Sequence, residues 1–135
     1  MKYMLDTNIC IYITKRKPRH VFDRFKQHQV GDIGISSITY AELQYGVQKS
    51  LHVQQNAMAL ANFVAPLVIH PFTAEAGLPY GVVRSGLEQD GNPIGPMDLL
   101  IAAHAKQLEH TLVTNNSREF ARVRGLQIEN WATMD

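Results

Sequence analysis

The sequence predicts an α/β fold in which a central, mostly parallel sheet is flanked by helices. Short apolar runs, each typical of a buried strand, alternate along the chain with segments whose apolar residues have helical spacing. Strands separated by helices indicate a parallel, doubly wound sheet. The 135 residues suffice for one hydrophobic core and are too few for two ordinary domains, so we expect a single domain over residues 1–135.

Capping residues define the elements in the first half of the chain. Asp6 ends the first strand, and Asp6-Thr7-Asn8 supplies turn and N-cap residues before the apolar residues that follow. Ser36 and Ser37 cap a helix that holds Glu42 in its first turns. The expected elements are strands over 3–5 and 33–35, and helices over 19–29, from the Ser36 cap to about 49, and over 53–63.

Prolines and glycines delimit the elements in the second half. Residues 73–88 have a helical pattern, but Pro79 removes a backbone donor and disfavours helix at the preceding residue, so Gly77 and Pro79 predict a break or kink. Pro96 suits the first position of a helix that holds Asp98 near its N-terminus. The expected elements are strands over 67–69, 112–114 and near 126–128, a helix from 97 to about 108, and a short helical turn that holds Glu119.

Composition excludes few classes of function. The net charge of +1 lacks the basic excess that is usual in nucleic-acid-binding domains. A basic cluster is nevertheless present, and such clusters are more often solvated faces than binding patches. The single cysteine, Cys10, excludes an internal disulfide and fits a reducing cytoplasm, where we expect the protein, with no membrane segment. The basic cluster consists of Lys15, Arg16, Lys17 and Arg19.

Acidic residues follow strands or begin helices at several places. Asp6 follows the first strand, Glu42 and Asp98 lie early in helices, and Asn116 with Glu119 follows the fourth strand. Such residues can converge at the carboxyl edge of a parallel sheet. Two carboxylates about 5 Å apart repel by roughly 3 kcal/mol at an effective dielectric of 20, so a cluster needs a cation or protonation. Magnesium prefers hard oxygen ligands. Helix capping explains Asp6 and Asp98 individually equally well, so both interpretations stay open.

The sequence lacks the motifs of other common catalytic mechanisms. The chain has no G-x-S-x-G elbow, P-loop or dinucleotide fingerprint, and its six histidines lack zinc-site spacing. His104 shares a helix with Asp98, but a packed or exposed histidine is the better expectation. Phosphatases with an aspartyl nucleophile carry a second aspartate where this chain has Asn8, which cannot transfer a proton.

An ordered set of motifs extends over nearly the whole chain. It consists of Met4-Leu5-Asp6-Thr7-Asn8, Ser36-Ser37-Ile38-Thr39 with Ala41-Glu42-Leu43 and Gly46, Asp98-Leu99-Leu100-Ile101-Ala102-Ala103-His104-Ala105, Thr114-Asn115-Asn116 with Arg118-Glu119-Phe120, and Glu129-Asn130-Trp131. This set resembles the PIN-domain ribonucleases, in particular the VapC toxins of toxin–antitoxin pairs. The resemblance implies a PIN-like three-layer fold. It also implies that Asp6, Glu42 and Asp98 form an acidic site, with Asp6 and Asp98 as metal ligands.

The same resemblance implies the cofactor, substrate and partners. It implies Mg²⁺, with Mn²⁺ as a substitute, and an RNA substrate, either a tRNA such as the initiator tRNA or a ribosomal RNA loop. A VapB-like antitoxin would inhibit the enzyme, and homodimers and toxin–antitoxin hetero-oligomers would form. Thr7, Asn8 and Thr114 would support the site, and we expect the basic cluster at residues 15–19 to guide RNA toward it.

One motif departs from the family. Many PIN domains carry an acid where this chain has Asn116, so Glu119 is the residue that we expect to supply the fourth charge, with Asn116 in a supporting role.

Two alternative functions stay open beside the toxin. They are a PIN nuclease of RNA processing without an antitoxin, and a noncatalytic receiver or RNA-binding module. A receiver needs an aspartate after its third strand and a lysine after its fifth, where this chain has His70 and Glu129.

Overall fold

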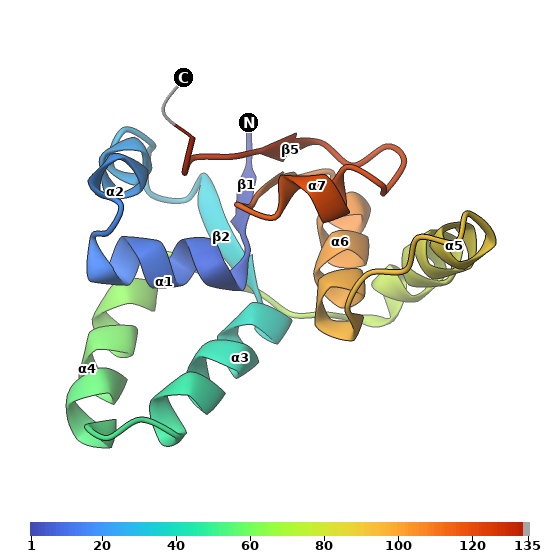
Figure 1. Ribbon diagram of the computed structural model, residues 1–135. Helices are drawn as coiled ribbons and strands as arrows, with labels where there is room; N and C mark the ends of the chain where they lie inside the picture. The colour runs from blue at the N-terminus through green and yellow to red at the C-terminus, as the bar shows by residue number, and fades with distance from the viewer. Residues whose placement is uncertain (134–135) are drawn as a thin grey trace.

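A five-stranded, fully parallel sheet forms the centre of the protein in the computed structural model, which describes residues 1–133 (Figure 1). The strand order is β3-β2-β1-β4-β5, with β1 in the middle. Tyr3 of β1 aligns with Ile33 of β2 on one side and with Thr111 of β4 on the other. The strands are β1 (Tyr3–Leu5), β2 (Ile33–Ser36), β3 (Val68–His70), β4 (Thr111–Val113) and β5 (Ile128–Glu129).

Helices cover both faces of the sheet, which gives the three layers that were expected. The outer layers contain α1 (Thr7–Lys15), α2 (Arg19–Lys26), α3 (Ser37–Gln48), α4 (Val53–Val64), α5 (Gly77–Gln89), α6 (Pro96–Leu108) and α7 (Ser117–Phe120). Figure 1 shows α1 to α4 together on one side of the molecule and α5 and α6 on the other. The expected α/β class with a parallel sheet is therefore confirmed.

Two hydrophobic clusters result from the alternation of side chains along the strands. Met4 of β1 packs with residues of α5 and α6, whereas the next residue, Leu5, packs with residues of α1 and α2. The same division separates Leu112 from Val113 in β4. Because β1 and β4 are buried on both faces, their positions are fixed, and so are the loops that leave their carboxyl ends.

The segment with Gly77 and Pro79 differs from the expectation. A short 3₁₀ turn, η1 (Ala74–Ala76), leads into α5, which begins at Gly77 and continues without a break through Pro79. Pro79 is the third residue of α5, where a backbone N–H has no partner within the helix, so the missing donor costs little. The predicted kink inside this helix is therefore wrong. Other expected bounds also differ, since α2 ends at Lys26, β3 spans Val68–His70, β4 spans Thr111–Val113 and β5 spans Ile128–Glu129.

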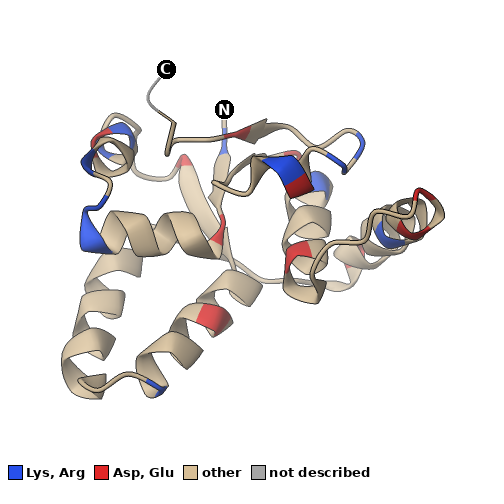
Figure 2. Cartoon of the chain, viewed as in Figure 1, with Lys and Arg blue, Asp and Glu red and all other residues tan. Residues whose placement is uncertain are grey.

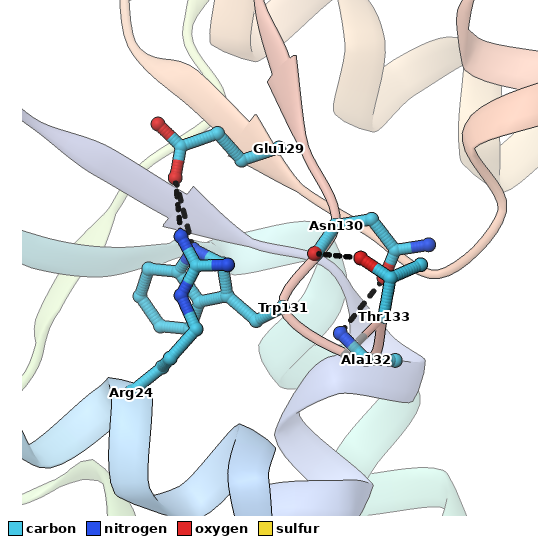
Figure 3. A network of polar contacts seen from close by, with 6 residues as sticks. All are labelled: Arg24, Glu129, Asn130, Trp131, Ala132 and Thr133. Carbon is cyan, nitrogen blue, oxygen red and sulfur yellow. Dashed lines mark hydrogen bonds and ion pairs between the residues drawn. The ribbon is translucent and has the colours of Figure 1, made fainter. Parts of the chain in front are cut away.

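Glu129 and Trp131, near the C-terminus, contact α2 and the loop that follows it. Glu129 accepts hydrogen bonds from Arg24 Nη2 at 3.3 Å and from Trp131 Nε1 at 3.0 Å, and Figure 3 shows both side chains converging on its carboxylate. Trp131 is fully buried, and its ring stacks on His28. These contacts hold β5 in place at the edge of the sheet beside β4. Within residues 1–133, no helix has the length and apolar character that crossing a membrane requires.

Candidate active site

Asp6 lies at the centre of the carboxyl edge of the sheet, directly after β1. Its side chain is 4% exposed and caps α1, because Oδ1 accepts a 2.9 Å hydrogen bond from the backbone N–H of Ile9. Desolvation by burial raises the pKa of Asp6 to about 6, and the negative charges of Asp98 and Glu42 act in the same direction. Hydrogen bonds from Thr114 and Ile9 oppose this increase. Asp6 therefore caps α1 and is also a desolvated carboxylate close to two other acids.

Thr7 connects this loop to α3. Its Oγ1 donates a 2.6 Å hydrogen bond to Oε1 of Glu42, a residue 35 positions later in the sequence. The Glu42 carboxylate therefore cannot rotate freely away from the end of β1. The supporting role expected for Thr7 has a geometric basis, whereas Asn8 is exposed.

Asp98 and Glu119 bring two further carboxylates to the same edge. Asp98 lies in the first turn of α6, whose N-cap is Gly95. Burial raises its pKa, and the charges of Glu119 and then Glu42 raise it further. Glu119, in the first turn of α7, accepts a 2.9 Å hydrogen bond from Nδ2 of Asn116. The acidic segments of α3, α6 and α7 surround the end of β1 (Figure 2).

These carboxylates have no cationic partner in the described part of the chain. The ion pairs within residues 1–133 involve other acids, and none includes Asp6, Glu42, Asp98 or Glu119. The helix-start interpretation accounts for each of two acids separately, because Asp6 Oδ1 caps α1 and Asp98 lies in the first turn of α6, but it does not explain why the acids gather at one edge. Partly buried anions that repel one another without a counter-charge are costly, and a hard divalent cation removes that cost. The donor set therefore fits such an ion.

The spacing of the acids fits a hydrated ion better than a closed cage. No three His, Cys, Asp or Glu side chains of residues 1–133 are arranged so that they enclose a metal by themselves. Magnesium in proteins is commonly held by one or two carboxylates and keeps several waters. Asp6 and Asp98 are the carboxylates with raised pKa values and so gain most from a cation. Glu42 and Glu119 each accept one hydrogen bond from a neighbouring side chain.

The basic cluster lies away from this edge. Lys15, Arg16, Lys17 and Arg19 are exposed at the end of α1 and the start of α2. A nine-residue helix is about 14 Å long, so the length of α1 separates the cluster from Asp6. Figure 2 shows the basic colour at that far end of α1. The role of the basic cluster in guiding RNA stays a prediction. Its position does not support direct contact with the reacting phosphate.

A polar network at the same edge was not predicted as a unit. Asn115 Nδ2 donates to the Tyr12 hydroxyl at 3.1 Å, and Asn130 Nδ2 donates to Asn115 Oδ1 at 3.2 Å. Asn115 was expected at a strand end, and Asn130 follows β5 in the same way. The sequence signal for this network was the recurrence of asparagine after strands, although the helix that supplies Tyr12 could be identified only from the tertiary structure.

Comparison with known proteins identifies the family of the chain. The family model described as "PIN domain" matches residues 3–126. The chain belongs to the PIN-domain family. It is 43% identical over 132 residues to the "tRNA(fMet)-specific endonuclease VapC" of Shigella flexneri, covering 98% of this chain and 99% of that protein. It is 47% identical over 132 residues to "Ribonuclease VapC2" of Rickettsia felis, covering 97% and 98%.

A solved structure supports the same assignment. The crystal structure of VapBC2 from Rickettsia felis bound to a DNA fragment from their promoter contains a chain that is 46% identical, with a TM-score of 0.92 over 97% of this chain and 99% of that one. The predicted identity, a PIN-domain ribonuclease of the VapC type, is confirmed. Nucleases with a PIN domain generally depend on a divalent metal, which is consistent with the unpaired carboxylates of this PIN domain.

Proposed function

We propose that this chain, as a single PIN domain over residues 1–135, is a Mg²⁺-dependent endoribonuclease toxin of a type II toxin–antitoxin system. The observation that supports the proposal most strongly is the group of carboxylates around the end of β1, which have no cationic partner among the ion pairs of residues 1–133. An RNA substrate and a reducing environment for Cys10 are consistent with action in the cytoplasm.

Each residue near this edge has a separate part in the proposed reaction. Asp6 and Asp98 would hold Mg²⁺ (or Mn²⁺), and Glu42 would add negative charge beside it. When bound, the ion acidifies a water and stabilises charge on the phosphate. Glu119 accepts the proton of the attacking water, because a carboxylate can do so near neutral pH and an amide cannot.

The remaining polar side chains orient these acids. Thr7 positions Glu42, and Asn116 positions Glu119 through the hydrogen bonds described above. Thr114 uses one hydroxyl for two contacts, since it hydrogen-bonds Asp6 and its Oγ1 also accepts from the backbone N–H of Asn116 at 2.8 Å. Asn8, which is exposed next to Thr7, is available to contact RNA or a metal-bound water.

We infer that the substrate is a tRNA, with the initiator tRNA as the first candidate. The Shigella flexneri relative, named for tRNA(fMet), is similar over almost its full length, and this supports a shared target class. Cleavage of a ribosomal RNA loop is the alternative outcome. Lys15, Arg16, Lys17 and Arg19 attract the RNA backbone over a longer range, since exposed cations act through the field that steers a polyanion.

A VapB-like antitoxin and a second copy of the chain are the proposed protein partners. The similar chain from Rickettsia felis was solved as VapBC2, and this supports a toxin–antitoxin hetero-oligomer. The homodimer is proposed from the resemblance to the family alone. A nuclease of RNA processing without an antitoxin is the second candidate, because the same carboxylates would serve it. A small open reading frame next to the gene favours the toxin, and its absence favours the processing enzyme.

Incubation of purified protein with total tRNA tests the proposed activity. The proposal predicts cleavage in Mg²⁺, no cleavage in EDTA, and recovery when Mn²⁺ is added. Sequencing of the product ends separates the initiator tRNA from elongator tRNAs, and purified ribosomes provide the ribosomal RNA arm. Cleavage that continues in EDTA would contradict the metal-dependent mechanism.

A further inference from the structure

Ser36 and His104 form a fully buried hydrogen bond between two distant parts of the chain. His104 Nδ1 lies 2.8 Å from Ser36 Oγ, although the residues are 68 positions apart, and neither side chain is exposed. His104 was expected to be packed or exposed, and it is packed. The hydrogen bond itself was not anticipated from either residue's local pattern.

The hydrogen bond joins the two helices that present Glu42 and Asp98. Ser36 ends β2 and caps α3, since its Oγ accepts a 3.1 Å hydrogen bond from the backbone N–H of Ile38. Glu42 is six positions after Ser36, and Asp98 is six positions before His104 on α6. Six residues span about 9 Å of helix, so each end of the hydrogen bond lies within two turns of an acid. Helices α3 and α6 also contact each other directly.

The proton positions of this pair follow from its surroundings. Desolvation by burial lowers the pKa of His104 to about 4, so its ring is neutral near neutral pH and carries one N–H. Ser36 Oγ accepts from Ile38, and its own hydrogen can be donated to Nδ1. With that direction of the hydrogen bond, the ring proton is on Nε2. Neither the nearby Pro71 carbonyl nor any other group of residues 1–133 gives Nε2 a hydrogen bond of normal geometry.

A histidine whose second buried nitrogen has at most a weak contact with the Pro71 carbonyl is less favourable in a core than an apolar side chain of similar size. The only hydrogen bond of normal geometry that the His104 ring makes within residues 1–133 is the one to Ser36. Packing alone therefore does not account for a histidine at this position. What the hydrogen bond adds is a fixed relation between α6 and the N-terminus of α3.

We propose that His104 is a positioning residue of the nuclease, whose hydrogen bond to Ser36 sets the location of Asp98 on α6 relative to Glu42 on α3. The inference rests on the proposed function, because these are the carboxylates assigned to the metal site. His104 does not touch the reacting atoms. Its loss lowers the turnover number by letting the acids separate, since a misplacement of about 1 Å can cost roughly 100-fold in rate.

Four variants and a double variant test this role. His104→Asn keeps a polar group near the Nδ1 position, whereas His104→Leu removes it. Ser36→Gly removes the hydroxyl, yet glycine remains an acceptable N-cap. Val21→Ala, in the other hydrophobic cluster, is the matched control for a loss of stability. The measurements are kcat and KM for RNA cleavage, the Mn²⁺ dissociation constant from electron paramagnetic resonance, and thermal unfolding.

The proposal predicts that His104→Leu and Ser36→Gly each lower kcat by about 10- to 100-fold while KM changes little. His104→Asn should retain most of the activity, and Val21→Ala should lower only the unfolding temperature. Mn²⁺ affinity should fall in the same order as kcat. The Ser36→Gly/His104→Leu double variant should be no worse than either single variant, because both remove one shared hydrogen bond.

Three results would overturn the proposal. They are wild-type kcat in folded His104→Leu, equal losses in His104→Asn and His104→Leu, and additive losses in the double variant. If His104→Leu does not fold, Ser36→Gly and His104→Asn carry the same comparison. A wild-type protein that cleaves no RNA would refute the proposed function instead, and the Mn²⁺ affinities of the variants would still decide the positioning role.

Discussion

The Thr7 hydroxyl donates a 2.6 Å hydrogen bond to Oε1 of Glu42 and so joins the first residue of α1 to the second turn of α3. Thr7 follows Asp6 directly, so one short loop holds one acid of the site and orients another. A hydrogen bond to a charged group is worth about 1.5–3 kcal/mol, which is enough to select one side-chain orientation.

Replacing Thr7 tests this orientation. Thr7→Val has nearly the same shape but cannot donate, so Glu42 is released and the cleavage rate should fall by about tenfold or more. Thr7→Ser keeps the donor and should cleave at close to the wild-type rate. Single-turnover cleavage at saturating Mg²⁺ measures the difference. Equal rates for Thr7→Val and the wild type would show that this hydrogen bond has no part in turnover.

Glu119 and Asn116 should respond differently to magnesium. Glu119→Gln removes the proposed proton acceptor, so its rate should stay low at every Mg²⁺ concentration. Asn116→Ala keeps the Glu119 carboxylate but removes an amide oxygen that can orient a magnesium-bound water, so higher Mg²⁺ should restore much of its rate. Cleavage rates across a Mg²⁺ titration separate the two. An unchanged rate for Glu119→Gln would place its carboxylate outside the mechanism.

The raised pKa of Asp6 makes stability depend on pH. Burial raises it from 3.8 to about 6, so between these values the folded protein holds a proton that the unfolded chain has released. The free energy of unfolding therefore decreases as pH rises through this range. Above a pH of about 6 it has decreased by the full amount, about 2–3 kcal/mol. Asp6→Asn keeps an N-cap side chain and lacks this decrease.

Urea unfolding of the metal-free wild type and Asp6→Asn measures this effect. In EDTA, the stability of the wild type relative to Asp6→Asn should decrease between about pH 4 and about pH 6.5, and Mg²⁺ at the higher pH should recover much of the loss. A stability difference that does not vary with pH would mean that the Asp6 carboxyl is not held in a desolvated, acidic surrounding.

Reversing charges in the basic cluster should weaken RNA binding without changing turnover. Lys15→Glu/Lys17→Glu should raise the dissociation constant and flatten its dependence on salt, because fewer phosphates are neutralised. The kcat should persist, since α1 separates the cluster from Asp6. Arg84→Glu/Arg124→Glu, on exposed residues of α5 and the turn after α7, is the matched control. Equal affinity and salt slope for the two double variants would identify the cluster as an ordinary solvated face.

The sequence was sufficient for the features that depend on local pattern. The strands were predicted from apolar runs. Asp6 and Ser36 were predicted as N-caps, and Pro96 as the first residue of a helix, and the structure confirms these positions. The order of the strands was not predicted. Register and neighbour relations come from packing between segments far apart in the chain, as with Tyr3 between Ile33 and Thr111.

The features that could not be predicted from the sequence depend on contacts between residues far apart in the chain. Pro79 looked like a helix breaker because its tolerance depends on where the helix begins, and α5 begins only two residues earlier. The acidic residues were found from their places after strands and early in helices. The hydrogen bonds that orient them, such as Thr7 to Glu42, join residues that no local pattern relates.

Cleavage of tRNA by Asp98→Asn tests most directly whether these carboxylates form a catalytic metal site. The variant removes one charge from the first turn of α6 and keeps a side chain of nearly the same size. Asp90→Asn, on an exposed carboxylate at the end of α5, is the control. With both variants folded and Mg²⁺ saturating, the account predicts wild-type cleavage by Asp90→Asn and none above the EDTA background by Asp98→Asn. Cleavage by Asp98→Asn at the wild-type rate would contradict it.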